Sequence, residues 1–376
     1  MRLYIPKTFY RVPPLFIPLI FYMISTILFW GIINGTMPAL YALLFFYLVA
    51  LCIALCHKSN PYTIAFIIAA LLLSGVRNYQ TISYYRAFPF ALTEQSATIQ
   101  ATFSNYSYNS KSRFAHCHTL AVHTVRTHTV EKQIAYTIQL YTRKKLEAAI
   151  DDTIELANLT LKRPKHDPFY LYLMKEGIAA TAFQEHQSVT ILSHSMFSVS
   201  RWLFERKQNM IQLFQCNLNK PTFGLFTALF LGEKTALKHD THSLENSFKQ
   251  WGIVHYLARS GLHLVIIISL CHFLLQCLPL GFIYKQLLLF FAILIYALLS
   301  WSSISFMRAL VIFLMYTFCL ITRRPYHMMH LLLACCFLFL IINPLYLLFL
   351  DFQLSFGLTF ALAWLNLFKM VGPVGN

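Results

Sequence analysis

Long runs of apolar residues alternate along this chain with short polar connections. A helix needs about 20 apolar residues to cross the hydrocarbon core of a bilayer, and most of the runs approach that length. The pattern predicts about eight membrane-spanning helices, some before residue 78 and the rest after residue 250. The runs lie near 15–34, 38–56, 62–76, 253–278, 286–301, 304–322, 328–346 and 352–370.

Residues 78–195 follow a different pattern, in which apolar and polar positions alternate with a period of two. This alternation is typical of half-buried strands. About five short strands predict a small β-barrel, for which the OB-fold is the leading candidate. The predicted fold class is a polytopic α-helical membrane protein with an inserted small β-barrel (OB-like) domain. The expected strands lie near 97–103, 119–125, 135–141, 152–162 and 179–192.

The segment after the strands separates them from the second group of apolar runs. Residues 198–218 alternate apolar and charged positions at helical spacing, which predicts an amphipathic helix at a membrane surface. Residues 222–231 are apolar but too short to span, so we expect a re-entrant or buried helix. The predicted domains are therefore N-terminal helices at 1–77, the β domain at 78–195, the amphipathic and re-entrant segment at 196–250, and a membrane domain at 251–376.

Composition agrees with a membrane protein. Hydrophobic residues make up 57% of the chain and charged residues only 12%, whereas a soluble domain has about 25% charged residues. The formal net charge of +16 suits anionic lipid headgroups or a polyanionic substrate. Basic cytoplasmic loops would produce the same excess, so the charge alone does not identify a nucleic-acid partner.

Cations also predict the orientation, because Lys and Arg gather in cytoplasmic loops. The N-terminal cations precede an apolar run that lacks an obvious cleavage site, which indicates an uncleaved first helix with a cytoplasmic N-terminus. Arg323 and Arg324 favour a cytoplasmic connection after the run at 304–322. Both counts place the β domain outside the cytoplasm.

Two histidines and an arginine stand at the start of the run at 253–278. Ionisable groups are costly at membrane depth and usually face a bundle interior or a water-filled path. His255 and His263 are about two turns apart, so on an unbroken helix they share a side. Two interpretations of these histidines remain: they line a polar transport path, or they pack against other helices. For Arg259, one interpretation is a contact with a phosphate and the other is a side chain that extends to the membrane interface. For Ser260-Gly261, the two interpretations are a break in the helix and close packing against a neighbouring helix.

Arg308 lies near the start of another apolar run and needs a partner there. Asp351 is the candidate for a structural ion pair, because both residues are predicted near the outer side. The alternative is that Arg308 faces the transport path. Glu233 and Gln353 are further polar positions that we assign to this path.

Aromatic and cationic residues mix within the β domain. This mixture suits a single nucleic-acid strand, because bases stack on rings while phosphates meet cations. A solvated barrel face is the alternative. The candidates are Tyr106, Tyr108, Lys111, Arg113, Phe114, Arg143, Lys144 and Lys145.

Metal and cofactor chemistry is not predicted. His116, Cys117 and His118 lie close in sequence, but no carboxylate motif accompanies them. Nucleotide-binding glycine motifs are also missing from the required spacing. We therefore expect no metal site, no cofactor and no nucleotide hydrolysis.

Four segments, in order, resemble the ComEC competence family: 163–181, 228–263, 304–309 and 343–356. The resemblance implies a bacterial inner-membrane channel that passes single-stranded DNA into the cytoplasm during natural transformation. It implies a periplasmic DNA receptor and a cytoplasmic helicase-like motor as partners, beside membrane lipids, with homo-oligomerisation left open. The implied path residues are Glu233, His255, Arg259, Ser260, Gly261, His263, Arg308 and Gln353.

The chain also departs from the family. Arg259 stands where members usually have a small apolar residue, and no His-x-His-x-Asp-His motif of the metallo-β-lactamase-like nuclease domain occurs. We therefore expect a non-enzymatic protein: a short member, a fragment, a partner of a separate nuclease, or an inactive remnant. The rival functions are transport of another anionic or lipid-linked substrate, and a membrane-embedded enzyme that uses His255, His263 and Asp351.

Overall fold

A computed structural model describes most of the chain, and its contacts divide into two compact units. Unit 1 comprises Met1–Ser83, Leu278–Phe290 and Met307–Asn376, and unit 2 comprises Tyr84–Cys277 and Phe291–Phe306. We describe each unit by itself. The described residues are 15–33, 61–88, 97–108, 114, 116–127, 131–144, 146, 148–162, 168–184, 189–195, 198–231, 250, 261–300 and 303–371.

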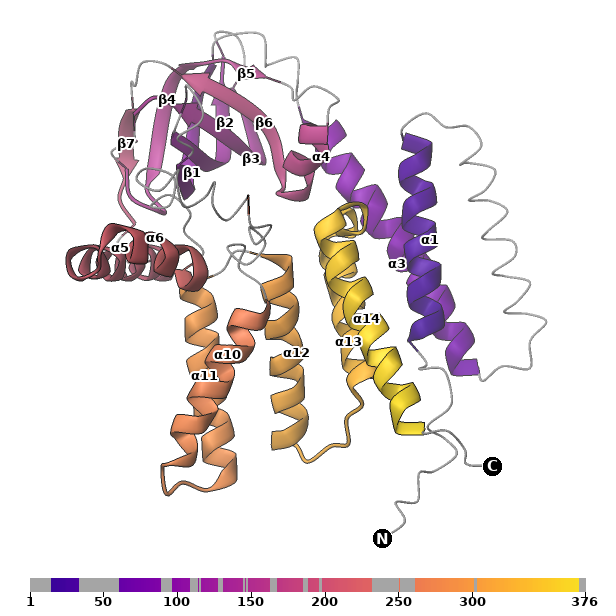
Figure 1. The fold of residues 1–376 in the computed structure, drawn as a ribbon. Helices are drawn as coiled ribbons and strands as arrows, with labels where there is room; N and C mark the ends of the chain where they lie inside the picture. Colours follow the sequence, from indigo (N-terminus) through magenta and orange to yellow (C-terminus); the bar gives the residue numbers. More distant parts are fainter. Residues whose placement is uncertain are drawn as a thin grey trace. The chain divides into compact units, whose positions relative to one another are not determined.

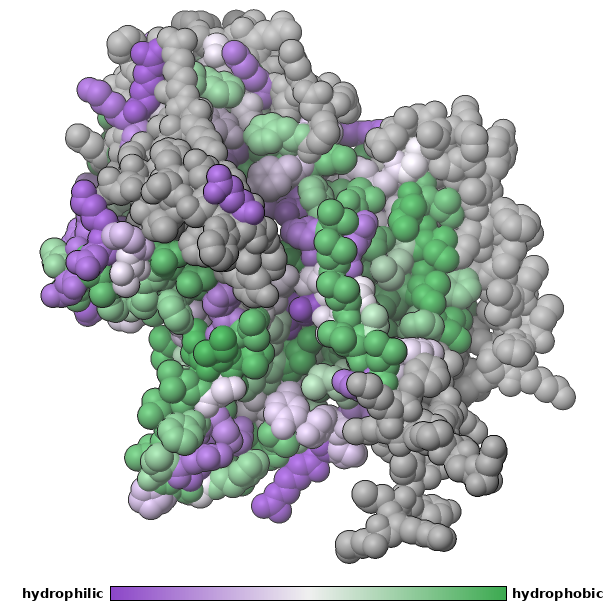
Figure 2. Space-filling view, in the orientation of Figure 1, coloured by the Kyte–Doolittle hydropathy of each residue, from purple (hydrophilic) through white to green (hydrophobic). Residues whose placement is uncertain are grey.

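Apolar helices occupy the predicted runs that fall within the described residues (Figure 1). Hydrophobic side chains gather over these helices in Figure 2. Among the described residues, three helical segments are long and apolar enough to cross a membrane, namely 65–86, Phe282–Leu299 and Ile304–Ile321. The run at 38–56 lies outside the described residues. The helices are α1 (Phe16–Ile33), α3 (Pro61–Arg86), α10 (Gly261–Gln276), α11 (Phe282–Leu299), α12 (Ile304–Ile321), α13 (Met328–Ile342) and α14 (Leu350–Val371).

A buried polar ladder joins α1 to α3 in unit 1. Trp30 Nε1 donates to Asn78 Oδ1 over 3.1 Å, and Asn78 Nδ2 donates to the carbonyl oxygen of Ser74 over 2.8 Å. The hydroxyl of Ser74 lies 3.1 Å from that of Thr26 and donates to that of Ser25. Polar side chains that leave water need such partners, so the ladder aligns the two helices.

The end of α13 is held by side chains from α1 and α3. The last carbonyls of a helix have no partner within the helix itself. Tyr22 donates to Leu340 O over 2.8 Å, and Arg77 donates to Ile341 O over 2.7 Å and to Ile342 O over 2.6 Å. These bonds tie the N-terminal helices to the C-terminal ones.

The helix α3 continues to Arg86, past the end of its apolar run. The polar residues that interrupt the run, Arg77 and Asn78, satisfy their side chains within unit 1 and leave the helix intact. In unit 2, Tyr85 at the end of α3 donates to Met174 O over 2.6 Å, and Tyr84 packs on Tyr136. The predicted boundary at residue 77 therefore falls inside a helix.

The β domain contains a mixed sheet of seven strands among the described residues, in the order β5-β6-β3-β2-β1-β4-β7. Neighbours are antiparallel except β3 and β6, which are parallel. About five short strands were predicted. The first three are longer than expected, and two of the expected regions each contain a pair of strands. The strands are β1 (Ala97–Tyr108), β2 (His116–Arg126), β3 (Glu131–Thr142), β4 (Thr153–Leu159), β5 (Leu161–Lys162), β6 (Ile178–Gln184) and β7 (Val189–Ser193).

One face of the sheet forms an apolar core. Alternate residues of β1 to β4, among them Ile99, Leu120, Ile138 and Ile154, are fully buried. The short helix α4 (Pro168–Lys175) ends at Gly177, whose φ of +76° suits a residue without a side chain and turns the chain into β6. The buried residues therefore follow the period-two alternation of the sequence.

A second helical segment follows the sheet. The helix α5 (Val199–Asn217) occupies the stretch predicted as amphipathic, with Ser198 as its N-cap. It is followed by α6 (Lys220–Phe226) and by a π-helical turn, η3 (Thr227–Leu231).

Replacing Asn78 with Leu should destabilise unit 1, because Trp30 and Thr26 would each lose a buried hydrogen-bond partner. We expect a loss of about 1–2 kcal/mol in the free energy of unfolding, measured by thermal denaturation of the full chain in detergent. Tyr79→Phe, on the exposed side of the same helix, is the control. Equal melting temperatures for Asn78→Leu and wild type would contradict the role of the ladder.

Candidate functional site

Aromatic rings line up across neighbouring strands of the sheet. In the register, Cys117 on β2 is opposite Tyr141 on β3, and Tyr141 is opposite Phe183 on β6. The rings of Tyr141 and Phe183 are nearly parallel, with centroids 5.0 Å apart and an angle of 12° between their planes. Phe114 meets the edge of the Phe183 ring at 5.5 Å. We call Phe114, Tyr141 and Phe183 the aromatic platform.

Cations lie against the rings of this platform. The Nζ atom of Lys162 is 5.6 Å from the centroid of the Phe183 ring, and the guanidinium carbon of Arg143 is 5.9 Å from that of Phe114. The Phe183 side chain is 41% exposed, so a planar ligand can reach it. Exposed aromatic rings with neighbouring cations also occur on protein surfaces that bind single-stranded nucleic acid.

The phenol of Tyr141 and the thiol of Cys117, which is opposite it on β2, are both neutral. Burial raises the pKa of the Tyr141 phenol, and the neighbouring Cys117 and Tyr172 raise it further. Burial also raises the pKa of the Cys117 thiol, although hydrogen bonds from Ser107, Gln139 and Tyr141 oppose the shift. Because both groups stay protonated at neutral pH, the cations set the charge of this surface.

The predicted DNA-binding residues of the β domain divide between the platform and other places. Phe114 belongs to the platform, Arg143 lies against its ring, and the next residue, Lys144, is exposed. Tyr106 instead hydrogen-bonds His116 Nδ1 through its hydroxyl at 2.8 Å. Tyr108 is the last residue of β1. Lys111, Arg113 and Lys145 lie outside the described residues.

Arg308 occupies a half-buried position on α12 in unit 1. Its Nη1 donates to the hydroxyl of Thr359 on α14, and its guanidinium carbon lies 5.7 Å from the centroid of the Phe356 ring. Among the described residues, Thr359 is the one hydrogen-bond acceptor of this guanidinium, which has five N–H groups. Arg308 is therefore oriented by one contact and keeps donors for a further anion.

Asp351 does not supply the partner that we expected for Arg308. It is exposed at the start of α14, where its Oδ1 accepts a hydrogen bond from the backbone N–H of Phe352 over 3.0 Å. A carboxylate in the first turn of a helix is stabilised by the unpaired N–H groups there. Within the described residues, the hydrogen-bond partner of Arg308 is therefore Thr359, and not Asp351 as expected.

The remaining path residues are described only in part. Gly261 begins α10, and His263, two residues later, is half-buried. In unit 1, Gln353 donates to Leu347 O over 2.8 Å. Glu233, His255, Arg259 and Ser260 lie outside the described residues.

Sequence reasoning did not nominate Tyr141, Phe183 or Lys162 as site residues. Tyr141 follows the buried Leu140 on β3, and its partner on β6 is brought beside it only by the parallel pairing of β3 with β6. Similarly, Phe356 and Thr359 contact Arg308 through the packing of α12 with α14.

The histidines near Cys117 make contacts with hydroxyl groups. His118 Nε2 lies 3.1 Å from Thr142 Oγ1, and His123 Nε2 lies 2.6 Å from Thr102 Oγ1. Over the part of the chain that the structure describes, there is no group of three or more His, Cys, Asp or Glu residues able to hold a metal ion.

Comparison with known proteins identifies one family. Residues 229–369 match the family model described as "Competence protein", which is consistent with a ComEC-family competence protein. The matched segment begins in η3 and continues into α14, and it covers less than half of the chain. No curated protein and no solved structure matched the chain.

The raised pKa of Tyr141 should make the protein less stable in alkali. The phenol of the unfolded chain ionises near its ordinary value of about 10, so raising the pH through that value favours unfolding. We expect Tyr141→Phe to reduce the loss of melting temperature between about pH 9 and about pH 11. Tyr284→Phe, which removes an exposed phenol on α11, is the control. An identical pH dependence for Tyr141→Phe and wild type would contradict the shift.

Proposed function

We propose that this chain, whose competence-protein domain is consistent with the ComEC family, carries single-stranded DNA across the bacterial inner membrane during natural transformation. The family match indicates a role in DNA uptake. The finer role as a channel is our proposal, and the aromatic platform with its cations is the observation that carries it. The platform receives the incoming strand outside the cytoplasm, and the helices of the matched segment conduct it.

The platform favours a single strand over a duplex. In a duplex the bases are stacked on each other and unavailable, whereas the bases of a single strand can stack on protein rings. The exposed Phe183 ring offers a stacking surface, and Lys162 and Arg143 provide charge for the neighbouring phosphates. Neutral Tyr141 adds ring area without repelling the phosphates.

The strand pairing supports an OB-like interpretation of the sheet. β1 pairs with both β2 and β4, and β3 pairs with β6 in parallel. OB-folds bind oligonucleotides on the face of their second and third strands. Tyr141 lies on β3, which makes the platform a continuation of that face onto β6.

Arg308 is the proposed phosphate contact in the membrane. A guanidinium binds phosphate through paired N–H groups, and Thr359 occupies only one of its donors among the described residues. We further propose that Glu233, His255, Arg259, Ser260, Gly261, His263 and Gln353 line the same path. A periplasmic DNA receptor would deliver the strand and a helicase-like cytoplasmic motor would pull it.

Removing the platform should weaken the binding of single-stranded DNA. Phe183→Ala should lower affinity for an oligonucleotide by about 1–3 kcal/mol, measured by fluorescence anisotropy on the full chain in detergent. Lys162→Gln should reduce the salt dependence of binding, because one phosphate contact is lost.

Leu192→Ala is the matched control, since Leu192 is an exposed apolar residue on β7 of the same sheet. Binding that is unchanged in Phe183→Ala, or equally weakened in Leu192→Ala, would contradict a stacking role for the platform.

Arg308→Gln should block transformation while DNA still reaches the periplasm, because the proposed phosphate contact is removed inside the membrane. The measurement is the ratio of labelled DNA in the cytoplasm to that in the periplasm, at equal protein level. Arg324→Gln, in the connection between α12 and α13, is the control. Normal cytoplasmic entry in a strain that lacks the chain would refute the channel and favour another transported substrate.

A further inference from the structure

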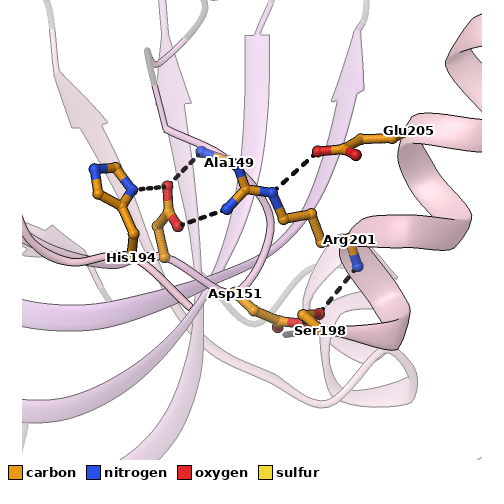
Figure 3. A network of polar contacts seen from close by, with 7 residues as sticks. Ala149, Asp151, His194, Ser198, Arg201 and Glu205 are labelled. Atoms are coloured by element: carbon orange, nitrogen blue, oxygen red, sulfur yellow. Dashed lines mark hydrogen bonds and ion pairs between the residues drawn. The ribbon is translucent and has the colours of Figure 1, made fainter. Parts of the chain in front are cut away.

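The helix α5 is fixed to the sheet by its N-terminal end (Figure 3). Ser198 donates to a carboxylate oxygen of Asp151, and Arg201 Nη1 donates to Asp152 Oδ1 over 3.4 Å. The carboxylate of Asp152 is almost fully buried and also accepts from Ala149 N over 3.0 Å. These contacts hold the side of α5 that carries Arg201 against the β domain.

Three exposed apolar side chains of α5 lie on the side away from Arg201. At 3.6 residues per turn, Val199, Trp202 and Leu213 share that side with the exposed cation of Arg206. The three apolar residues are 61%, 53% and 63% exposed, and no residue of the helix is buried. Exposed apolar side chains beside a cation are typical of a helix surface at a membrane interface.

Contacts within unit 2 lead from α5 to the end of an apolar helix long enough to span a membrane. The Phe214 ring of α5 packs on Phe226 of α6 at 4.5 Å, and Phe226 packs on Phe230 of η3 at 5.1 Å. The carbonyl oxygen of Phe230 accepts hydrogen bonds from Tyr296 and from Ser300. Ser300 directly follows Phe282–Leu299, which is long and apolar enough to cross a membrane. This chain of contacts connects the end of α5 to the end of that helix, where a spanning helix would reach the membrane interface.

The charges of α5 complement an anionic surface. Arg201, Arg206 and Lys207 outnumber the single acidic residue, Glu205. The guanidinium carbon of Arg206 lies 5.6 Å from the Trp202 ring, which joins a cation to an exposed indole. Trp and Arg in this arrangement are typical of helices that lie in the boundary between headgroups and acyl chains.

We propose that α5 lies in the bilayer interface and binds anionic phospholipid headgroups through Arg206 and Lys207. Val199, Trp202 and Leu213 enter the acyl boundary, while Arg201 holds the helix on the sheet through Asp152. The β domain is thereby positioned on the membrane by a lipid contact. This inference is independent of the proposed transport of DNA.

The test is the fluorescence of Trp202 in nanodiscs that contain the full chain and equal amounts of phosphatidylcholine and phosphatidylglycerol. Subtracting the emission of Trp202→Phe isolates this residue among the five tryptophans. Bromine, which quenches nearby indoles, is placed on the acyl chains of one lipid or of the other. We expect quenching to be at least about 2-fold greater with brominated phosphatidylglycerol, because each cation attracts anionic lipid.

The double variant Arg206→Gln, Lys207→Gln should equalise the two quenching values, and Arg206→Lys, Lys207→Arg should preserve the difference. Lack of quenching by either lipid would overturn the proposal and indicate that protein, such as a second copy of the chain, covers α5. Equal quenching by both lipids in wild type would overturn the selection of anionic headgroups.

Discussion

Polar groups removed from water must find partners, and this constraint organises the described helices of both units. In unit 1, Asn78 links α3 to α1, and Arg77 occupies the carbonyls that end α13. In unit 2, the π-helical turn η3 presents a carbonyl of Phe230 to two hydroxyls at the end of α11. Such bonds specify which helices meet and in what rotation, whereas apolar surface alone lets helices pack in many ways.

The same constraint gives Arg308 a particular place in α12. A guanidinium in an apolar helix is retained only where it has partners, and Thr359 and Phe356 of α14 provide one hydrogen bond and one ring. This support orients the cation while leaving most of its donors for a ligand. The contacts with α14 are thus compatible with the phosphate contact proposed for Arg308.

The β domain combines a buried core with a connection to the helix α5. Its inward face is mainly apolar across β1 to β4, and the two polar side chains buried there, His118 and Thr142, contact each other. Its connection to α5 relies on the buried carboxylate of Asp152, since an unpaired carboxylate there would be costly. With the proposed roles of the aromatic platform and of α5, an incoming strand would be brought close to the membrane surface.

The sequence alone determined the kinds of element and many of their positions. Apolar runs produced helices because backbone polar groups must be satisfied within the segment, and period-two alternation produced strands because successive side chains face opposite ways. The start of α5 is also local, because the side chain of Ser198 accepts a hydrogen bond from the backbone N–H of Arg201 and caps the helix. The tertiary structure decided the partners: the parallel pairing of β3 with β6 brought Phe183 beside Tyr141, and the rotation of α14 brought Thr359, rather than Asp351, to Arg308. Strand register and helix rotation depend on contacts between residues far apart in the chain, so no local pattern contains them.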